Sequence, residues 1–411
     1  MARDENNMKI LLSAYACWPR QGSEPNIGWN WCQFLAQQGH EVWLLTTPGG
    51  REEIEAECEK FPMIHPVFVE TPALPLRLDR LAEGRLGYFG WQAAAYRAAQ
   101  DILRQHPVEL AHHVTYGSLQ GGSQLWKLPI PFVFGPVGGA QTAPLAFFRY
   151  FREAGGFEVA RTLLTKLLRF FPPAVRTVRH AALVLATNTE TLQLVRRMGA
   201  RQADFFSDSG VPDSYVPAQC PVRTADHAEL KVLWVGGLVP RKALRLALEA
   251  LAQVPSAVPM HLTIIGSGPQ VARLPGWLAE LGLSDKVEYT GSLPWEKVQA
   301  YYRTHDVLLF TSLRDSTGIQ MAEAMAQAMP VIGLDHQGVR DVVPDGGGIR
   351  VPVTTPAQTV AGLAAALVRL QQNPAERIGM GVVAWQRARE FEWTPRARMM
   401  TALYQALLEK Y

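Results

Sequence analysis

Two acidic and two basic residues in the second half of the chain have types and spacing suited to chemistry. Asp315 and Glu323 are separated by seven residues and flank Gly318, where a buried strand gives way to an Ala- and Met-rich helix. A helix that begins at glycine presents free backbone N–H groups to phosphate, and a carboxylate further along can accept hydrogen bonds from sugar hydroxyls. Arg241 and Lys242 follow two glycines at another strand-to-helix turn, and adjacent cations suit a diphosphate. The alternatives are a solvated helix carboxylate, an N-capping aspartate and a solvated cation pair.

A histidine pair and a glycine turn are the next candidates. His112 and His113 end an apolar stretch of strand length, where a histidine is either catalytic or structural, and we expect His112 to be structural. The run Gly266–Pro269 holds a Gly-x-Gly turn without the rest of a dinucleotide fingerprint, so a plain tight turn explains it equally well. The four cysteines form no Cys-x-x-Cys pair, which favours reduced thiols and no metal.

The elements that must position these residues alternate between strand and helix. In the first half, an apolar run at 9–16, helical spacing at 27–35 and an apolar run at 41–47 make one βαβ unit, which implies a parallel sheet. A further helix is predicted at 90–105, with strands at 108–113, 132–134 and 183–186. In the second half we predict strands at 232–235, 261–265, 287–290, 307–310 and 331–333, and helices at 242–252, 270–281, 295–303, 319–328 and 356–372.

A proline-containing segment of little periodicity, 212–228, reads as a linker between these two series. The 411 residues exceed the roughly 250–300 that one core usually reaches. We therefore predict an α/β fold class with two Rossmann-like, doubly wound domains at 1–217 and 218–391. We expect the site in a cleft between them, at the carboxyl ends of the strands.

Composition limits the function classes. With 48% hydrophobic residues the chain is not wholly disordered, and a net charge of +3 is too small to indicate nucleic acid binding. No apolar run approaches the roughly 20 residues that span a bilayer. The first residues, MARDENN, do not resemble a secretion signal, so we expect a cytoplasmic protein.

The stretch 147–180 is basic and aromatic, with seven Arg or Lys residues against two glutamates. An interfacial helix on anionic lipid has this composition, and so does a core helix with a solvated basic face. Both readings remain open at the level of sequence.

Longer runs resemble one enzyme family. The turn GGLVPRK (236–242), the runs IIGSGP and VEYTG, and the segment from His305 to Gly333 resemble the donor-binding domain of the family 4 retaining glycosyltransferases, which have the GT-B fold. That family has Glu, seven residues, Glu; here Asp315 occupies the first position and Glu323 the second. In the first half, GSEPNIGW (22–29), HHVTYGS (112–118) and GPVGGA (135–140) are similar to one subgroup.

The resemblance implies roles for individual residues. Glu323 would hold the ribose of a nucleotide sugar, Arg241 and Lys242 would neutralise its diphosphate, and Asp315 would contact hydroxyls of the donor sugar. His113 would lie at the reaction centre, and a C-terminal helix at 392–411 would pack back on the first domain. The implied catalytic residues are His113, Asp315 and Glu323; the donor-binding residues are Gly22, Ser23, Gly237, Arg241, Lys242, Gly266, Gly318, Ile319 and Glu323; the acceptor-binding residues are Glu24, Gly138 and Gly139.

Two positions depart from the family pattern. Gly237 stands where the family usually has a phosphate-binding arginine, and Asp315 is one methylene shorter than the usual glutamate. The sequence has no Asp-x-Asp pair, so we expect transfer without a metal or other cofactor, from a UDP- or GDP-sugar cosubstrate.

The expected function is retaining transfer of a hexose to a glycan or lipid-linked acceptor. The expected partners are that donor and acceptor, without nucleic acid. A membrane contacted through 147–180 at its inner face is the alternative to a core helix with a solvated basic face. The alternatives are a nucleotide-sugar 2-epimerase-like enzyme, a catalytically silent nucleotide-sugar-binding partner of another transferase, and a two-domain sugar-binding protein.

Overall fold

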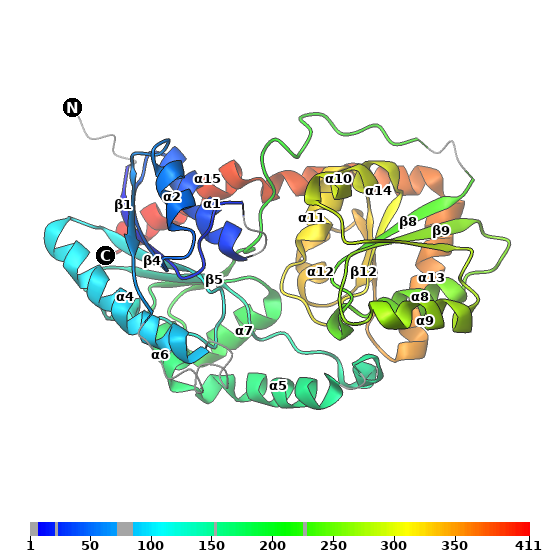
Figure 1. Cartoon of the computed structure of the whole chain (residues 1–411), viewed down its shortest axis with the longest axis horizontal. Helices are drawn as coiled ribbons and strands as arrows, with labels where there is room; N and C mark the ends of the chain where they lie inside the picture. The colour runs from blue at the N-terminus through cyan, green and yellow to red at the C-terminus, as the bar shows by residue number, and fades with distance from the viewer. Residues whose placement is uncertain (1–6, 21–23, 72–84, 152–153, 225–227) are drawn as a thin grey trace. The chain divides into compact units, whose positions relative to one another are not determined.

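The computed structural model describes residues 7–20, 24–71, 85–151, 154–224 and 228–411, and these form two α/β units (Figure 1). Unit 1 comprises 1–140, 166–208 and 393–411, and unit 2 comprises 141–165 and 209–392. No helix among the described residues is both long enough and apolar enough to cross a membrane.

The described part of unit 1 contains a seven-stranded sheet in the order β3-β2-β1-β4-β5-β6-β7. Every neighbouring pair of strands is parallel. The chain thus winds outward from β1 in one direction and from β4 in the other, and this reversal is the topological switch point. The strands are β1 (Lys9–Ala14), β2 (Glu41–Thr46), β3 (Ile64–Phe68), β4 (Leu110–Thr115), β5 (Phe132–Val137), β6 (Leu183–Ala186) and β7 (Ala203–Phe205).

Helices cover both faces of this sheet. Alternate residues of β1 enter different cores: Ile10 and Leu12 pack in one, and Leu11 packs in the other. The first core is completed by α1 (Glu24–Gln37), α2 (Arg51–Cys58) and α15 (Trp393–Leu408), and the second by α4 (Arg85–Gln105), α6 (Pro172–His180) and α7 (Thr189–Met198). Burial on both faces explains the near-continuous apolar runs of these strands.

Unit 2 has the same architecture, a parallel sheet with helices on both faces. Its described residues form a six-stranded parallel sheet in the order β10-β9-β8-β11-β12-β13, with the switch point between β8 and β11. The strands are β8 (Leu230–Val235), β9 (Met260–Ile265), β10 (Val287–Gly291), β11 (Val307–Phe310), β12 (Val331–Leu334) and β13 (Gly348–Val351).

The helices of unit 2 also bury both faces of the sheet. One core contains residues of α8 (Leu244–Ala252), α9 (Leu274–Leu281) and α13 (Pro356–Gln372), and the other contains residues of α10 (Trp295–Thr304), α11 (Ile319–Ala326), α12 (Gln337–Val342) and α14 (Pro374–Ala388). Phe147, Tyr150 and Phe151 join the first of these cores. They lie in and after a 3-10 helix, η2 (Leu145–Tyr150), which precedes α5 (Gly155–Leu167).

The structure corrects several sequence-based boundaries. The sequence predicts 141–165 as part of the first domain, but this segment belongs to unit 2 because aromatic side chains of η2 pack in that core. The change of unit after α7 comes at 208–209 rather than at 217–218, because the segment from Val211 to Val216 packs in the second core of unit 2. The strand expected at 9–16 ends at Ala14, and the helix expected at 319–328 ends at Ala326.

Candidate functional site

The candidate donor site of unit 2 is built at the carboxyl ends of β8 and β11. These strands flank the switch point, where the chain leaves the sheet in opposite directions and the two loops diverge. The loop after β8 carries Arg241 and Lys242 in a short 3-10 helix, η5 (Pro240–Lys242). The loop after β11 carries Asp315 and leads to Gly318 at the start of α11. The topology therefore brings these predicted residues together.

Glycines allow the loops after β8 and β9 to approach closely. Gly266 has φ +142°, and a Cβ atom there would lie 1.9 Å from the carbonyl oxygen of Gly236. Leu238 N–H donates to the Ser267 carbonyl at 2.8 Å, which ties the same two loops. Gly237 differs, because a Cβ atom there would meet only ordinary contacts, with Ser267 O at 3.7 Å. Gly266 is thus required by packing, whereas position 237 has room for a side chain.

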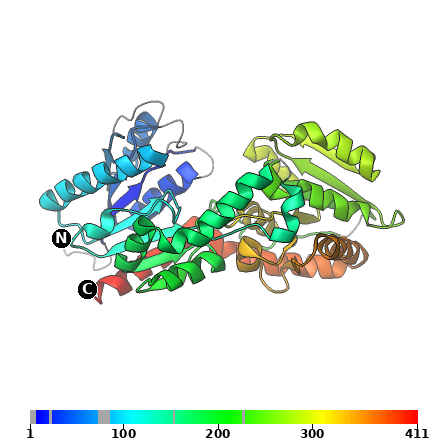
Figure 2. The ribbon, with the colours of Figure 1, turned by 90° about the horizontal axis from the view of Figure 1, so that it is seen from below.

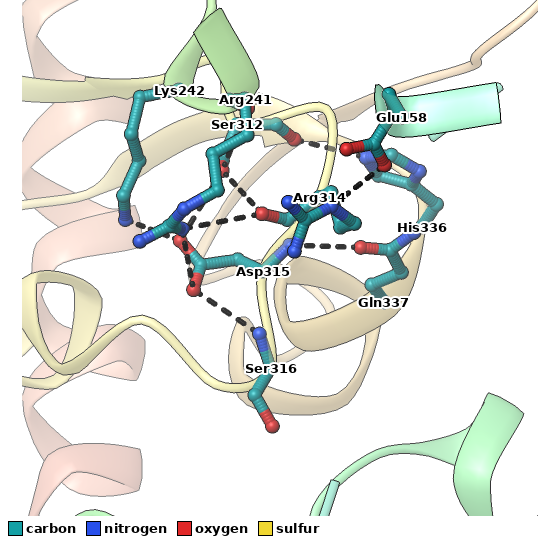
Figure 3. A network of polar contacts seen from close by, with 9 residues as sticks. All are labelled: Glu158, Arg241, Lys242, Ser312, Arg314, Asp315, Ser316, His336 and Gln337. Atoms are coloured by element: carbon teal, nitrogen blue, oxygen red, sulfur yellow. Dashed lines mark hydrogen bonds and ion pairs between the residues drawn. The ribbon is translucent and has the colours of Figure 1, made fainter. Parts of the chain in front are cut away.

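Asp315 is the centre of a half-buried polar network (Figure 3). Its carboxylate forms an ion pair with Lys242 Nζ and lies 3.7 Å from Arg241 Nη1. The Ser312 hydroxyl donates to Oδ2 at 3.2 Å, and the Ser316 N–H donates to Oδ1 at 3.1 Å. Burial by itself would raise the pKa of Asp315, but the charges of Lys242 and then Arg241 outweigh it and hold the pKa below its usual value. The carboxylate is therefore ionised at neutral pH.

Lys242 is the buried cation of the pair. Its side chain is 9% exposed, and Nζ lies 5.0 Å from the centroid of the Phe310 ring. The Arg241 guanidinium is more accessible, at 38%. Asp315 thus balances the charge of Lys242, the residue that the family resemblance implies for the diphosphate.

The Asp315 loop is held by residues that sequence reasoning missed. Gln337 Oε1 accepts the Asp315 N–H at 2.9 Å, and its Nε2 donates to the Thr142 carbonyl at 2.8 Å. Arg314 Nε donates to Glu158 Oε1 on α5 at 2.8 Å. Glu158 and Gln337 are distant in sequence from the loop, and no local motif signals either contact.

His336 also holds this loop. Its Nε2 lies 3.0 Å from the Ser312 carbonyl oxygen, which can only accept, so Nε2 carries the proton. Burial lowers the pKa of His336.

Glu323 lies on α11, and its carboxylate is bound by two hydrogen-bond donors from α10. Gly318, with φ +77°, starts this helix against the Phe310 ring, and Ile319 is its first residue. The Glu323 carboxylate accepts from Trp295 Nε1 and from the Tyr302 hydroxyl, each at 2.8 Å. Burial raises the pKa of Glu323, although both donors act against that rise. One oxygen atom is bound by each donor, so each retains a lone pair for another partner.

The two histidines of unit 1 lie on β4, beside the other switch point. His113 is fully buried; its Nε2 lies 3.2 Å from the Tyr116 carbonyl and 3.3 Å from the Tyr88 hydroxyl. Nδ1 lies 3.5 Å from the Ser13 hydroxyl. The carbonyl can only accept, so Nε2 carries the proton. Burial lowers the pKa of His113 to about 4, which makes it neutral at physiological pH.

His112 faces the opposite side of the sheet. Its Nδ1 lies 2.5 Å from the Tyr404 hydroxyl on α15, and its Nε2 is bound to the Gly135 carbonyl. Burial lowers its pKa to about 3. These contacts give His112 the structural role expected of it.

The predicted acceptor-binding residues of unit 1 lie in adjoining loops. Glu24 begins α1, and its Oε1 accepts the Gly117 N–H at 2.6 Å. Burial raises the pKa of Glu24 to about 7, against the lowering effect of that hydrogen bond. Gly138 N–H donates to the Gly117 carbonyl at 2.9 Å, and Gly139 O accepts from Gln120 Nε2 at 3.2 Å. The predicted residues Gly22 and Ser23 lie outside the described residues.

Over the described ranges, no group of three or more His, Cys, Asp or Glu side chains is arranged to hold a metal ion. All four cysteines are free thiols.

Comparison with known proteins identifies relatives that match part or most of the chain. Residues 220–379 match the model of glycosyl transferases group 1. A 2-deoxystreptamine glucosyltransferase of Streptomyces kanamyceticus is 27% identical over 77% of this chain and 84% of its own. A D-inositol 3-phosphate glycosyltransferase of Kineococcus radiotolerans is 30% identical over 55% of this chain and 57% of its own.

Solved structures share the fold. A sucrose-phosphate synthase from Thermosynechococcus elongatus superposes with a TM-score of 0.68 at 20% identity, over 98% of this chain and 100% of that one. Anabaena HepE in complex with UDP superposes with a TM-score of 0.63 at 16% identity, over 97% of this chain and 100% of that one.

Proposed function

Since the chain is a glycosyltransferase with the GT-B fold and a group 1 glycosyl transferase domain, we propose that it moves a hexose from a nucleotide diphosphate sugar to a glycan or lipid-linked acceptor. We propose UDP before GDP as the carrier, because HepE has been solved with UDP and with UDP-glucose. Transfer proceeds with retention and without a metal ion.

The pair of cations at the switch point is the observation that carries this proposal. Arg241 and Lys242 lie in the loop after β8, and both form ion pairs with the Asp315 carboxylate (Figure 3). A diphosphate supplies the negative charge that such a site attracts, and the N–H groups near Gly318 add hydrogen bonds to it.

When the donor binds, Lys242 exchanges the Asp315 carboxylate for the diphosphate. The diphosphate takes the ammonium group, and the freed Asp315 carboxylate accepts hydrogen bonds from hydroxyl groups of the donor sugar. Each charge is then paired with a ligand group, so no buried charge is left uncompensated.

Glu323 holds the ribose. Its carboxylate is fixed by Trp295 and Tyr302, and the remaining lone pair on each oxygen faces two neighbouring ribose hydroxyls. Because both oxygen atoms are already oriented, little side-chain entropy is lost when the ribose binds.

The departing diphosphate is stabilised by fixed charge. The charge that develops on the leaving oxygen is neutralised by Arg241, Lys242 and the α11 N-terminus. In metal-dependent enzymes a divalent ion neutralises this charge. The acceptor attacks on the face that the diphosphate leaves, which retains the configuration. His113, neutral and held by Tyr116 and Tyr88, orients groups at the reaction centre through hydrogen bonds.

The acceptor binds on the unit 1 side. Glu24 receives its hydroxyl group, and the backbone at Gly138 and Gly139 lies against it. A lipid-linked acceptor would bring the enzyme to the inner, cytoplasmic face of a membrane.

A transfer assay in EDTA tests the proposal. The protein is incubated with UDP- and GDP-hexoses and simple glycan or lipid-linked acceptors, and the anomeric proton of the product is followed by NMR. We expect turnover with a UDP-sugar and a product of the same anomeric configuration as the donor. Restoration of activity only by Mg²⁺ or Mn²⁺, or inversion at the anomeric carbon, would contradict the metal-free retaining mechanism. Isomerisation of the donor without acceptor would indicate a 2-epimerase.

A further inference from the structure

Helix α5 buries polar side chains and exposes apolar ones, the reverse of an ordinary amphipathic surface helix. Its buried residues are polar, namely Glu158, Thr162 and Thr165. Its apolar side chains face solvent: Phe157 is 63% exposed and Leu164 65%. We call this face, Phe157, Val159, Leu163, Leu164 and Leu167, the α5 apolar face. Apolar side chains that stay in water do not add to the free energy of unfolding. Contiguous exposed apolar residues of this kind therefore indicate a binding partner.

Polar contacts hold α5 with that face outward. Glu158 accepts from Arg314 Nε at 2.8 Å and lies 3.7 Å from Arg161 Nη1. Arg161 also donates to the Gln141 carbonyl at 3.1 Å. Just before the helix, Phe147 and Phe151 are buried in the core of unit 2. The apolar face is thus turned outward by specific contacts on the other side of the helix. In the view of Figure 2 no other element is drawn in front of α5.

The surroundings of the α5 apolar face are positively charged. Within 155–170 the exposed charged side chains are the cations Lys166 and Arg169, whereas the carboxylate of Glu158 is buried against Arg314. Lys166 and Arg169 are exposed, and the Arg169 guanidinium lies 4.7 Å from the centroid of the exposed Phe170 ring. Aromatic and aliphatic side chains flanked by long cationic ones match the boundary between acyl chains and anionic headgroups.

We propose that the α5 apolar face docks on an anionic lipid bilayer, with Phe157, Leu163, Leu164 and Leu167 inserted below the headgroups and Lys166 and Arg169 paired with lipid phosphates. The charge favours this occupant over a second copy of the chain, because two such faces would bring their own cations together. The proposal is independent of the sugar chemistry, although a lipid-linked acceptor would lie in the same bilayer.

Vesicle flotation of the full chain tests the docking. We expect co-flotation with vesicles of mixed phosphatidylcholine and phosphatidylglycerol, weaker binding to phosphatidylcholine alone, and weakening by added salt. The double variant L163Q/L164Q should lower the bound fraction by about tenfold or more, because both side chains lose their apolar insertion. The control V222Q/V382Q changes two exposed valines elsewhere and should float like the unchanged protein.

The cations are tested separately. K166Q/R169Q should reduce binding to anionic vesicles and flatten its salt dependence, whereas R51Q/K60Q, which removes two exposed cations from unit 1, should not. Since all substituted residues are exposed, circular dichroism should show unchanged folding. No flotation with anionic vesicles, or flotation unaffected by L163Q/L164Q, would overturn the proposal. A dimer in sedimentation that L163Q/L164Q dissociates would also overturn it, in favour of a second copy. Because flotation involves no sugar donor, a failed glycosyl transfer leaves this result unaffected.

Discussion

At the scale of single residues, the account depends on the exchange of partners at Lys242. Replacing Lys242 with Met removes the buried cation and leaves the Asp315 carboxylate with the more distant charge of Arg241 and with neutral hydrogen-bond donors. We therefore expect both the affinity for the donor and the free energy of unfolding to decrease. The double variant K242M/D315N removes both charges of the pair, and we expect it to recover most of the stability but none of the affinity.

Calorimetry with UDP and urea unfolding separate these two effects. We expect UDP affinity to fall about 10- to 100-fold in both variants, as loss of a charge-assisted hydrogen bond predicts. K297M changes an exposed lysine on α10 and serves as the control. Recovery of UDP affinity in the double variant would show that Lys242 serves folding alone.

A substitution at Gly237 should increase the affinity for UDP. The backbone there is not in the left-handed region, and a Cβ atom would make only ordinary contacts, so the position accepts a side chain without strain at Cβ. G237R should therefore raise UDP affinity, by about tenfold if one charge-assisted contact forms. G276R adds the same charge to α9, where nothing lies within 4 Å of the new Cβ atom, and should leave the affinity unchanged. Equal effects of the two variants would indicate general electrostatic attraction instead of a phosphate contact.

His113 and His112 should respond differently to substitution. H113A should lower turnover strongly while UDP affinity changes much less, because His113 acts at the reaction centre and not on the nucleotide. H112A should instead lower the free energy of unfolding, since it breaks the contacts with Tyr404 and Gly135. Parallel losses of turnover and UDP affinity in H113A would mean that this histidine is structural too.

Glu24 should make stability depend on pH. Its pKa is raised from 4.5 to about 7 in the folded chain, so the folded state binds more protons than the unfolded state between these values. Its contribution to the free energy of unfolding therefore falls as pH rises from about 4.5 to 7, by roughly 3 kcal/mol at most.

The variant E24Q removes this titration and keeps an oxygen atom for the Gly117 N–H. We expect E24Q to be more stable than the unchanged protein at about pH 8 and to differ little at about pH 4.5 in urea unfolding. A pH-independent difference would exclude a raised pKa at Glu24.

At the scale of elements, the central strands and the helices beside the switch points were predictable. The apolar runs at 183–186 and 307–310 coincide with β6 and β11, and the periodicity at 356–372 coincides with α13. These elements are buried on a regular face or on both faces, so burial and sequence pattern agree. The edge strands β3, β7 and β13 were not predicted, because edge positions are half-buried and carry Pro66, Asp204 and Arg350. α14 was also missed.

The site was predictable in part for the same reason. Lys242, Asp315 and Glu323 follow strands in the sequence, and parallel topology brings such positions to one edge. Their partners Trp295, Tyr302 and Gln337 come from other elements, and only the packed chain places them. The inverted orientation of α5 was equally beyond the sequence, since apolar residues at helical spacing normally predict a buried face.

The C-terminal helix α15 should contribute to the stability of unit 1. Trp393, Met400, Tyr404 and Leu407 are buried in a core that they share with α1 and β1. M400A should lower the free energy of unfolding by about 2–5 kcal/mol, as for other large-to-small changes in a core. M399A, one residue away on the exposed side, should cost little. Equal costs for the two variants would contradict the packing of α15 on this core.

At the scale of the whole molecule, the first six strands of unit 1 and the six described strands of unit 2 follow the same order, and both units carry polar residues at the switch point. In unit 2 the switch point carries the cations and acids proposed for the donor, and in unit 1 it carries the histidines and Glu24. The topology therefore accounts for the positions of residues that are widely separated in the sequence. Gly237 and Asp315, the two residues that differ from the family pattern, both lie in the site of unit 2.

The most direct test is a metal-free thermal-shift series with UDP, GDP, ADP and their common sugars, run in parallel on the unchanged protein and on K242M/D315N. A ligand at 100 times its dissociation constant stabilises the folded state by about 2.7 kcal/mol, which gives a measurable rise in Tm. We predict a clear rise with UDP and a UDP-sugar for the unchanged protein and none for the double variant. No rise with any nucleotide, or an equal rise in the variant, would contradict a nucleotide-sugar site at Lys242 and Asp315.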